Sequence, residues 1–396
     1  MTGKLFRICL WGLFLLGCAE LIFRTVIFPE YKAMMPDRFV QRPGFVYGNK
    51  PGAEIRRYNP MNYDVMVHTN SMGFRGLEEN LKEELAGYWV AGGSNTFGAY
   101  VEDADVFAAR LKAYGYPSAN VAVDGHEVAD QVLILRDLIE RGYKPRGVLL
   151  SLTALSSLRD YSGRMEVLTQ ELGVADSAAK EESNRPRDNL RESSLALWYQ
   201  IPRSFQSVRG RLIKSSALYG WLKVGIMGIP ALRDWTLSTG LRADLDLAHS
   251  GSLDILRPLD SNNPDWPRIT STADLIAMLG DLVRDKLGVP FGVILLPTHH
   301  QIYPDKFRRY VDHNGLQNED LDPRRSLLAI ERELVRRGVP VLNTLPALKK
   351  EATARLTFPD DGHLIPQGHA IVAGAVARWL DAGMPPGAEG AAGVSQ

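Results

Sequence analysis

The sequence predicts an α/β fold, a three-layer αβα sandwich around a five-stranded parallel sheet of the flavodoxin-like type. Two observations support this prediction. Apolar runs of strand length alternate with amphipathic helical stretches along the chain. This alternation produces parallel strands, because each helix carries the chain back to the same end of the sheet. The strands are expected at residues 88–92, 119–123, 147–153, 291–297 and 340–343.

Helical stretches with an apolar side follow four of these strands, and we expect them to cover both faces of the sheet. They span residues 105–114, 128–142, 324–337 and 366–382. Between the third and fourth strands, residues 158–287 interrupt the alternation, and we interpret them as an insertion. Within it, residues 217–232 are too short and too rich in glycine for a membrane span. Their expected role is packing within a cap, with contact to the bilayer surface as the alternative.

The ends of the chain differ in composition from this predicted domain at residues 86–382. Residues 29–85 are rich in proline, glycine, asparagine and tyrosine and lack sustained periodicity. They are interpreted as a linker that becomes an irregular lead-in. Residues 383–396 have the composition of a disordered tail.

The composition excludes several classes of protein. The chain has 396 residues, and 46 lysines and arginines balance 46 aspartates and glutamates without a long basic run. Nucleic acid is therefore not an expected partner. The only cysteines, Cys9 and Cys18, lie near the N-terminus, so the rest of the chain can form neither a disulfide nor a thiolate metal site. The turn at Gly92 lacks both the GxGxxG pattern and the Gly-Lys pair of phosphate loops, and no cofactor is expected.

The N-terminal residues combine a positive flank with an apolar run. Lys4 and Arg7 precede the apolar residues 8–19. Glu20 and Arg24 follow, four residues apart, where one helical face would let them pair. The whole apolar segment is long enough to span a bilayer.

We interpret residues 1–28 as a signal anchor in an inner membrane. Because positive flanks stay in the cytoplasm, the rest of the chain would face the periplasm or the extracytoplasmic space. Two alternatives remain open. Leu15-Leu16-Gly17-Cys18 resembles a bacterial lipoprotein processing site, in which Cys18 becomes the lipidated first residue. The segment could also be a buried N-terminal helix of a cytosolic protein.

Residues with catalytic chemistry fall where predicted strands end. In an open parallel sheet, functional groups gather at the carboxyl ends of the strands. Ser94 follows the first strand in a turn of small residues, and Asp360 and His363 precede the last helix. A serine hydroxyl becomes a nucleophile when a base takes its proton, and a carboxylate orients that base. Ser94, His363 and Asp360 provide one of each, with Asp361 as the reserve carboxylate. The alternative role of Ser94 is that of a helix cap.

These motifs resemble the SGNH, or GDSL-type, hydrolases and acyltransferases. The resemblance covers residues 60–382 apart from the insertion and rests on Gly-x-Ser-x-Thr-x-Gly after the first strand and Asp-x-x-His before the last helix. Residues 68–76 (HTNSMGFRG) are similar to a lead-in of membrane-anchored members, and residues 297–303 (PTHHQIY) match after the fourth strand. Such members are often encoded with exopolysaccharide or cell-envelope assembly functions.

The resemblance implies a role for each candidate residue. Ser94 would be the nucleophile, His363 the base and Asp360 its orienter. The backbone amides of Ser94 and Gly125 would form the oxyanion hole. The implied activity is that of a serine esterase or O-acyltransferase, acting on acyl, above all acetyl, esters of an envelope or secreted polysaccharide. Envelope assembly proteins would be further partners.

The sequence departs from the family pattern at two places. Gly92-Gly93-Ser94 replaces Gly-Asp-Ser, which is compatible with activity because that aspartate is not a triad member. The Asn-Asp pair expected after the third strand is replaced by Ser156 and Ser157. The asparagine normally completes the oxyanion hole, and Ser156 could donate a hydroxyl only from a shorter reach. A non-catalytic SGNH-fold protein that binds glycan or acts as a scaffold is therefore the alternative.

Four further side chains are candidates for a role at or near this site. Asn95 either contacts the acyl group or braces the turn. His299, at the end of the fourth strand, is a candidate substrate contact, and its adjacent pair with His300 is not metal-ligand spacing, so no metal is expected. His126 is expected at the rim of the site and His369 in the packing of the last helix.

Overall fold

The computed structural model describes residues 2–34, 36–42, 45–154, 157–171, 215–229, 231–232, 254–313, 316–358 and 362–385. The chain divides into two compact units. The first comprises Met1–Asp37, Ile55–Met66 and Ser194–Ala243. The second comprises Arg38–Glu54, Val67–Ser193 and Asp244–Gln396.

The second unit is built on a five-stranded parallel sheet. Its strands are β5 (Tyr88–Ala91), β6 (Ser118–Asn120), β7 (Gly147–Thr153), β8 (Phe291–Leu296) and β9 (Val341–Asn343). Their order in space is β6-β5-β7-β8-β9, and every neighbouring pair is parallel. This is the flavodoxin-like order, which confirms the predicted fold class. The direction of strand order reverses beside β5, and ligands of such sheets bind at the carboxyl ends there.

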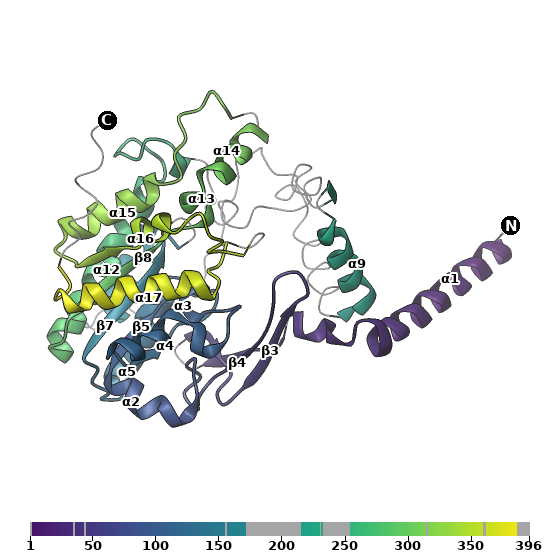
Figure 1. The fold of residues 1–396 in the computed structure, drawn as a ribbon, viewed down its shortest axis with the longest axis horizontal. Helices are drawn as coiled ribbons and strands as arrows, with labels where there is room; N and C mark the ends of the chain where they lie inside the picture. The colour runs from purple at the N-terminus through teal and green to yellow at the C-terminus, as the bar shows by residue number, and fades with distance from the viewer. Residues whose placement is uncertain are drawn as a thin grey trace. The chain divides into compact units, whose positions relative to one another are not determined.

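Helices cover both faces of the sheet (Figure 1). One layer contains α5 (Val128–Glu140), α12 (Trp266–Leu287) and α15 (Arg325–Arg336). The other layer contains α4 (Phe107–Arg110), α16 (Leu345–Lys350) and α17 (Pro366–Asp381). Further helices connect these elements: α2 (Leu81–Ala86), α3 (Ser94–Phe97), α6 (Met165–Glu171), α13 (His299–Ile302) and α14 (Pro304–His313). The two central strands β7 and β8 are buried along almost their whole length, as expected for strands covered on both faces.

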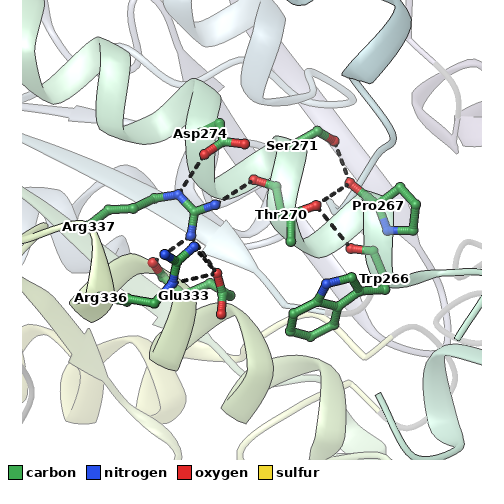
Figure 2. A network of polar contacts seen from close by, with 8 residues as sticks. All are labelled: Trp266, Pro267, Thr270, Ser271, Asp274, Glu333, Arg336 and Arg337. Carbon is green, nitrogen blue, oxygen red and sulfur yellow. Dashed lines mark hydrogen bonds and ion pairs between the residues drawn. The ribbon is translucent and has the colours of Figure 1, made fainter. Parts of the chain in front are cut away.

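The helix α12 belongs to the layered core, although it lies within the range predicted as an insertion. Figure 2 shows how Arg337, at the C-terminal end of α15, attaches α12 to α15. Arg337 donates to Asp274 of α12 at 2.7 Å and to Glu333 of α15 at 2.6 Å. Arg336 adds a hydrogen bond of 2.8 Å to Glu333. Burial alone would raise the pKa of Glu333, but the hydrogen bonds from both arginines outweigh it and lower the pKa.

The lead-in contains two β-hairpins that the sequence pattern did not predict. One pairs β1 (Phe39–Arg42) with β2 (Phe45–Asn49), and the other pairs β3 (Glu54–Asn59) with β4 (Tyr63–His68). Both are two-stranded ribbons, which are marginal alone and depend on contacts with the rest of the chain. In the first hairpin, Tyr47 donates a hydrogen bond of 3.2 Å to the carbonyl oxygen of Asp124, beyond strand β6.

The first unit contains the N-terminal helix α1 (Thr2–Ile22), which continues as a π-helical turn over Phe23–Ile27. Among the described residues, one helix, Phe6–Ile27, is long and apolar enough to cross a membrane. It is not buried against the protein, and its composition fits a membrane anchor or a signal sequence. The same unit holds α9 (Ala217–Gly228), which begins beside the C-terminal part of α1.

Candidate active site

Ser94 is the first residue of the short helix α3, at the carboxyl end of β5. The turn before it is too tight for a side chain. A Cβ atom on Gly92 would lie 2.2 Å from Oγ1 of Thr96 and 2.9 Å from the carbonyl oxygen of Ser151. After α3, Gly98 adopts a left-handed conformation with φ of 71°, which ends the helix without strain because glycine lacks a Cβ atom. The small residues seen in the sequence therefore hold Ser94 at the edge of the sheet.

His363 lies within hydrogen-bonding distance of Ser94. Its Nε2 atom is 2.7 Å from the Ser94 hydroxyl oxygen, across 269 residues of chain. In the neutral tautomer with the proton on Nδ1, Nε2 accepts a hydrogen bond from the Ser94 hydroxyl. The ring of Tyr100 stands edge-on to the imidazole, with centroids 4.7 Å apart. The structure thus brings the predicted nucleophile and base together at the predicted edge of the sheet.

Asn95 connects the nucleophile turn to the histidine loop. Its side-chain oxygen accepts a hydrogen bond of 3.0 Å from the backbone nitrogen of Leu364, next to His363. On the other side of the loop, the backbone nitrogen of Phe358 donates to the carbonyl oxygen of His363 at 2.8 Å. Asn95 therefore links the turn to the histidine loop, and its contact with an acyl group stays a prediction. Asp360, Asp361 and Ser156 lie outside the described residues.

The loop after β6 contacts the turn that presents Ser94. Gly125 has φ of 85°, and a Cβ atom there would lie 2.6 Å from the hydroxyl of Tyr47. A Cβ atom on Gly93 would lie 3.3 Å from the carbonyl oxygen of His126, so the two loops are in contact. Within the described part of the chain, the amide nitrogens of Ser94 and Gly125 donate no hydrogen bond. The role of both amides in an oxyanion hole stays a prediction.

The hairpin of β1 and β2, with Arg38 just before it, contacts the loop after β6 at Asp124 and His126. Arg38 forms an ion pair of 2.7 Å with Asp124. His126 places Nε2 2.8 Å from the carbonyl oxygen of Tyr47, so Nε2 carries the proton, since a carbonyl only accepts. Burial lowers the pKa of His126. A neutral, buried ring bonded to backbone supports the loop structurally.

Two other histidines, His299 and His369, are buried side chains. His299 begins α13 at the carboxyl end of β8, is buried, and places its ring 4.0 Å from that of His300. His369 is fully buried on α17, and its Nδ1 accepts a hydrogen bond of 3.3 Å from the backbone nitrogen of Phe107. Burial lowers the pKa of His369 to about 3. Among the described residues no group of three or more potential metal ligands occurs.

Arg75 is a positioning residue to which sequence reasoning assigned no role. Its buried guanidinium donates to the carbonyl oxygens of Phe97 and Gly98 at 3.0 and 2.7 Å, and to that of Val101 at 2.6 Å. Its Nε donates to Asp103 at 2.6 Å. The last carbonyls of a helix lack partners within the helix, and a positive charge there is favourable. Arg75 thus fixes the C-terminal end of the helix that begins with Ser94.

Two further buried side chains hold the same turn. Gln131 of α5 makes two hydrogen bonds to the backbone of Gly92. Asn120 of β6 donates to the carbonyl oxygen of Thr96 at 2.8 Å. Of the three side chains that hold the turn, only Arg75 lies in a motif visible in the sequence, residues 68–76. Gln131 and Asn120 belong to no recognisable pattern.

The fold and the site define an α/β protein of flavodoxin-like topology with a hydrogen-bonded serine and histidine at the carboxyl edge of its sheet. The chain matches no protein-family profile and no curated protein sequence. One similar solved structure is that of LAE5, an α/β hydrolase enzyme from the metagenome of Lake Arreo, Spain. It is 12% identical, covers 74% of this chain and 93% of its own, and has a TM-score of 0.34. Likeness at this level is too distant to indicate an activity.

Proposed function

We propose that this chain is a membrane-anchored, extracytoplasmic serine esterase or O-acyltransferase of the SGNH type. Its substrate would be an acyl ester, above all an acetyl ester, of an envelope or secreted polysaccharide. The observation that carries the proposal is the 2.7 Å hydrogen bond between the Ser94 hydroxyl and Nε2 of His363. The N-terminal helix Phe6–Ile27, with the length and composition of an anchor, supports the membrane attachment.

The reaction would proceed through an acyl-enzyme. The Ser94 oxygen attacks the acyl carbonyl carbon while His363 takes the hydroxyl proton at Nε2. The amides of Ser94 and Gly125 stabilise the negative oxygen of the tetrahedral intermediate. His363 returns the proton to the leaving sugar oxygen, which departs and leaves the acyl group on Ser94. Water or a second sugar hydroxyl then attacks the carbonyl carbon of the acyl-enzyme and gives its proton to His363. The bond between the acyl group and the Ser94 oxygen breaks, and that oxygen takes the proton back from His363. Asp360 would orient the imidazole.

The oxyanion hole sets the expected rate of this reaction. The proposed hole would contain the two backbone amides of Ser94 and Gly125, whereas the SGNH family pattern adds an asparagine side chain that this sequence replaces by Ser156. The loss of one oxyanion donor costs about 2.7 to 4 kcal/mol, or roughly 10² to 10³ in rate. We therefore expect slow turnover of small activated esters, and faster turnover of a substrate that contributes binding energy through its sugar.

Turnover of a chromogenic acetyl ester and of an acetylated polysaccharide tests the proposal. The full-length protein in detergent should release acetate or transfer it to a sugar, and Ser94→Ala should abolish this activity. Ser162→Ala, which changes an exposed serine outside the site, is the matched control and should retain it. Equal turnover by wild type and Ser94→Ala would refute the assignment.

The second candidate function is a non-catalytic protein that binds glycan or acts as a scaffold for envelope assembly proteins. The replacement of the family asparagine by Ser156 favours it. Polysaccharide binding that persists in Ser94→Ala, together with no ester turnover by the wild type on any acetylated substrate, would support this function over catalysis.

A further inference from the structure

The helix α9 has one packed face and one exposed apolar face. On the packed face, Ala217 is buried in a cluster with Phe28 and Tyr31. The exposed face carries large apolar side chains at helical spacing, which continue just beyond the helix. These residues, the apolar stripe, are Trp221, Leu222, Ile226, Ile229 and Leu232, each between 40% and 50% exposed. Singly exposed apolar residues are ordinary, but a continuous stripe marks a surface that is covered in the working protein.

The N-terminus of α9 is attached directly to the N-terminal helix α1. Glu20 of α1 accepts hydrogen bonds from the backbone nitrogens of Ala217 and Leu218 at 2.8 and 3.1 Å. It also accepts one from the Ser216 hydroxyl at 2.7 Å. A carboxylate at this position satisfies free amides of the first turn and complements the helix dipole. The pair of Glu20 and Arg24, at 2.7 Å, therefore does more than neutralise two charges in an apolar segment.

The position of Glu20 along α1 determines how deep in a bilayer α9 would begin. The apolar segment Phe6–Ile27 has 22 residues, which at 1.5 Å per residue is about 33 Å and matches the roughly 30 Å hydrocarbon core of a bilayer. Glu20 lies about 10 Å before the end of this segment by the same rise. Amphipathic helices lie about 5 to 10 Å deep at the boundary between headgroups and acyl chains. In a bilayer that Phe6–Ile27 spans, this depth would place the first turn of α9 at that boundary.

The chemistry of the stripe fits lipid. The sequence of α9 contains no acidic residue and a single basic residue, Lys223. Trp221 stands at the start of the stripe and contacts Phe23 of the π-helical turn edge-on, with ring centroids 5.2 Å apart. Tryptophan is enriched where a membrane meets water. The stripe is therefore continuous with the surface of the helix that would enter the bilayer.

We propose that α9 is an interfacial helix whose apolar stripe lies in the outer boundary layer of the membrane that α1 crosses. This inference rests on the membrane attachment in the proposed function. It adds a second contact with the bilayer, so that the first unit is held on the membrane surface rather than tethered by one helix alone.

Site-specific fluorescence in lipid nanodiscs tests this inference on the full chain. In a Cys9→Ser, Cys18→Ser background, Leu222→Cys and Ile226→Cys carry an environment-sensitive fluorophore. Leu13→Cys in the apolar segment is the control for membrane insertion, and Asp281→Cys, on the exposed side of α12, is the control for water. The probes at 222 and 226 should emit at shorter wavelengths than the probe at 281, and lipids spin-labelled near the headgroup should quench them.

Each other outcome overturns the inference and shows which part has failed. If the probe at 13 is quenched while the probe at 222 emits like that at 281, the anchor stands and α9 lies in water. If the probe at 13 is not quenched by any spin-labelled lipid, the membrane attachment itself is wrong. If the probe at 222 is shielded but no lipid quenches it, protein covers the stripe, and two chains per nanodisc would identify a second copy as the occupant.

Discussion

Gln131 holds the backbone of Gly92 through two hydrogen bonds. Its Nε2 donates to the Gly92 carbonyl oxygen at 2.7 Å, and its Oε1 accepts from the Gly92 nitrogen at 3.1 Å. Gln131 is 1% exposed, so water cannot replace either bond. The turn that presents Ser94 is therefore fixed by a side chain on a different helix.

Replacement of this side chain by an apolar one should destabilise the second unit. In Gln131→Leu the buried amide of Gly92 loses its partner, which costs about 1 to 3 kcal/mol. We expect a lower midpoint of urea unfolding, measured by tryptophan fluorescence. We also expect Ser94 to react more slowly with a serine-directed probe. A variant that unfolds at the wild-type midpoint and reacts at the wild-type rate would show that the two hydrogen bonds are dispensable.

Arg75 should influence reactivity more than binding. Lysine keeps the charge but cannot donate to Phe97, Gly98 and Asp103 at once. A shift of about 1 Å in a reacting group can cost roughly 10²-fold in rate, so Arg75→Lys should lower kcat for a chromogenic ester while KM changes little. Lys112→Ala, which removes an exposed ion pair with Glu83, is the control and should leave kcat unchanged. A rise in KM at constant kcat would contradict a positioning role.

The buried His369 predicts a component of acid sensitivity. Burial, with the positive charges of Arg75 and Arg110 and the neighbouring His363, lowers its pKa from 6.5 to about 3. Between these values the unfolded chain binds a proton that the folded chain does not. The contribution of His369 to the free energy of unfolding is therefore complete above about pH 6.5. It decreases as the pH is lowered below that value, by up to about 1.4 kcal/mol per pH unit.

The variant His369→Gln keeps an acceptor for the Phe107 amide but cannot take up that proton. Its urea midpoint should be below that of the wild type at pH 7, and the gap should narrow at pH 5. A constant gap across this range would show that His369 does not carry the acid sensitivity.

The ion pairs of Arg337, with Glu333 of α15 and Asp274 of α12, should matter for stability and not for chemistry. Arg337 and Glu333 are 12% and 8% exposed at their side chains. Removal of one partner of a buried pair is strongly destabilising, and because Arg336 remains bonded to Glu333, we expect about 2 kcal/mol for Arg337→Ala. The exposed pair of Arg284 and Asp281 provides the control, since Arg284→Ala should change the unfolding free energy by less than about 1 kcal/mol. Equal effects of the two substitutions would contradict this account.

The sequence predicted the sheet well because its strands are local patterns. The run at residues 147–153 is apolar throughout and coincides with β7. At β6 the prediction extended to residue 123, whereas the strand ends at Asn120. Beyond Asn120, the backbone nitrogens of Val121 and Val123 still donate to the carbonyl oxygens of Val90 and Gly92 at 3.0 and 3.2 Å. Hydrogen bonding to the β5 segment therefore continues past the end of the regular strand.

The sequence predicted the site only where a local motif contains a residue type with a recognisable catalytic role. Ser94 in a turn of small residues and His363 before a helix are visible in the sequence, and the parallel topology explains why they meet. The hairpin that places Tyr47 against Gly125 was not predictable, because its strands show no alternation and depend on tertiary contacts. The same holds for Gln131 and Glu20, whose partners are 39 and 197 residues away.

The most direct test of the central claim is the reaction of the full-length protein with a fluorophosphonate, followed by peptide mapping of the modified residue. We predict that the wild type is labelled on Ser94, that Ser94→Ala is not labelled, and that His363→Ala is labelled far more slowly. A folded wild type that takes up no label, or a Ser94→Ala variant labelled as strongly as the wild type, would contradict the claim that Ser94 is a nucleophile activated by His363.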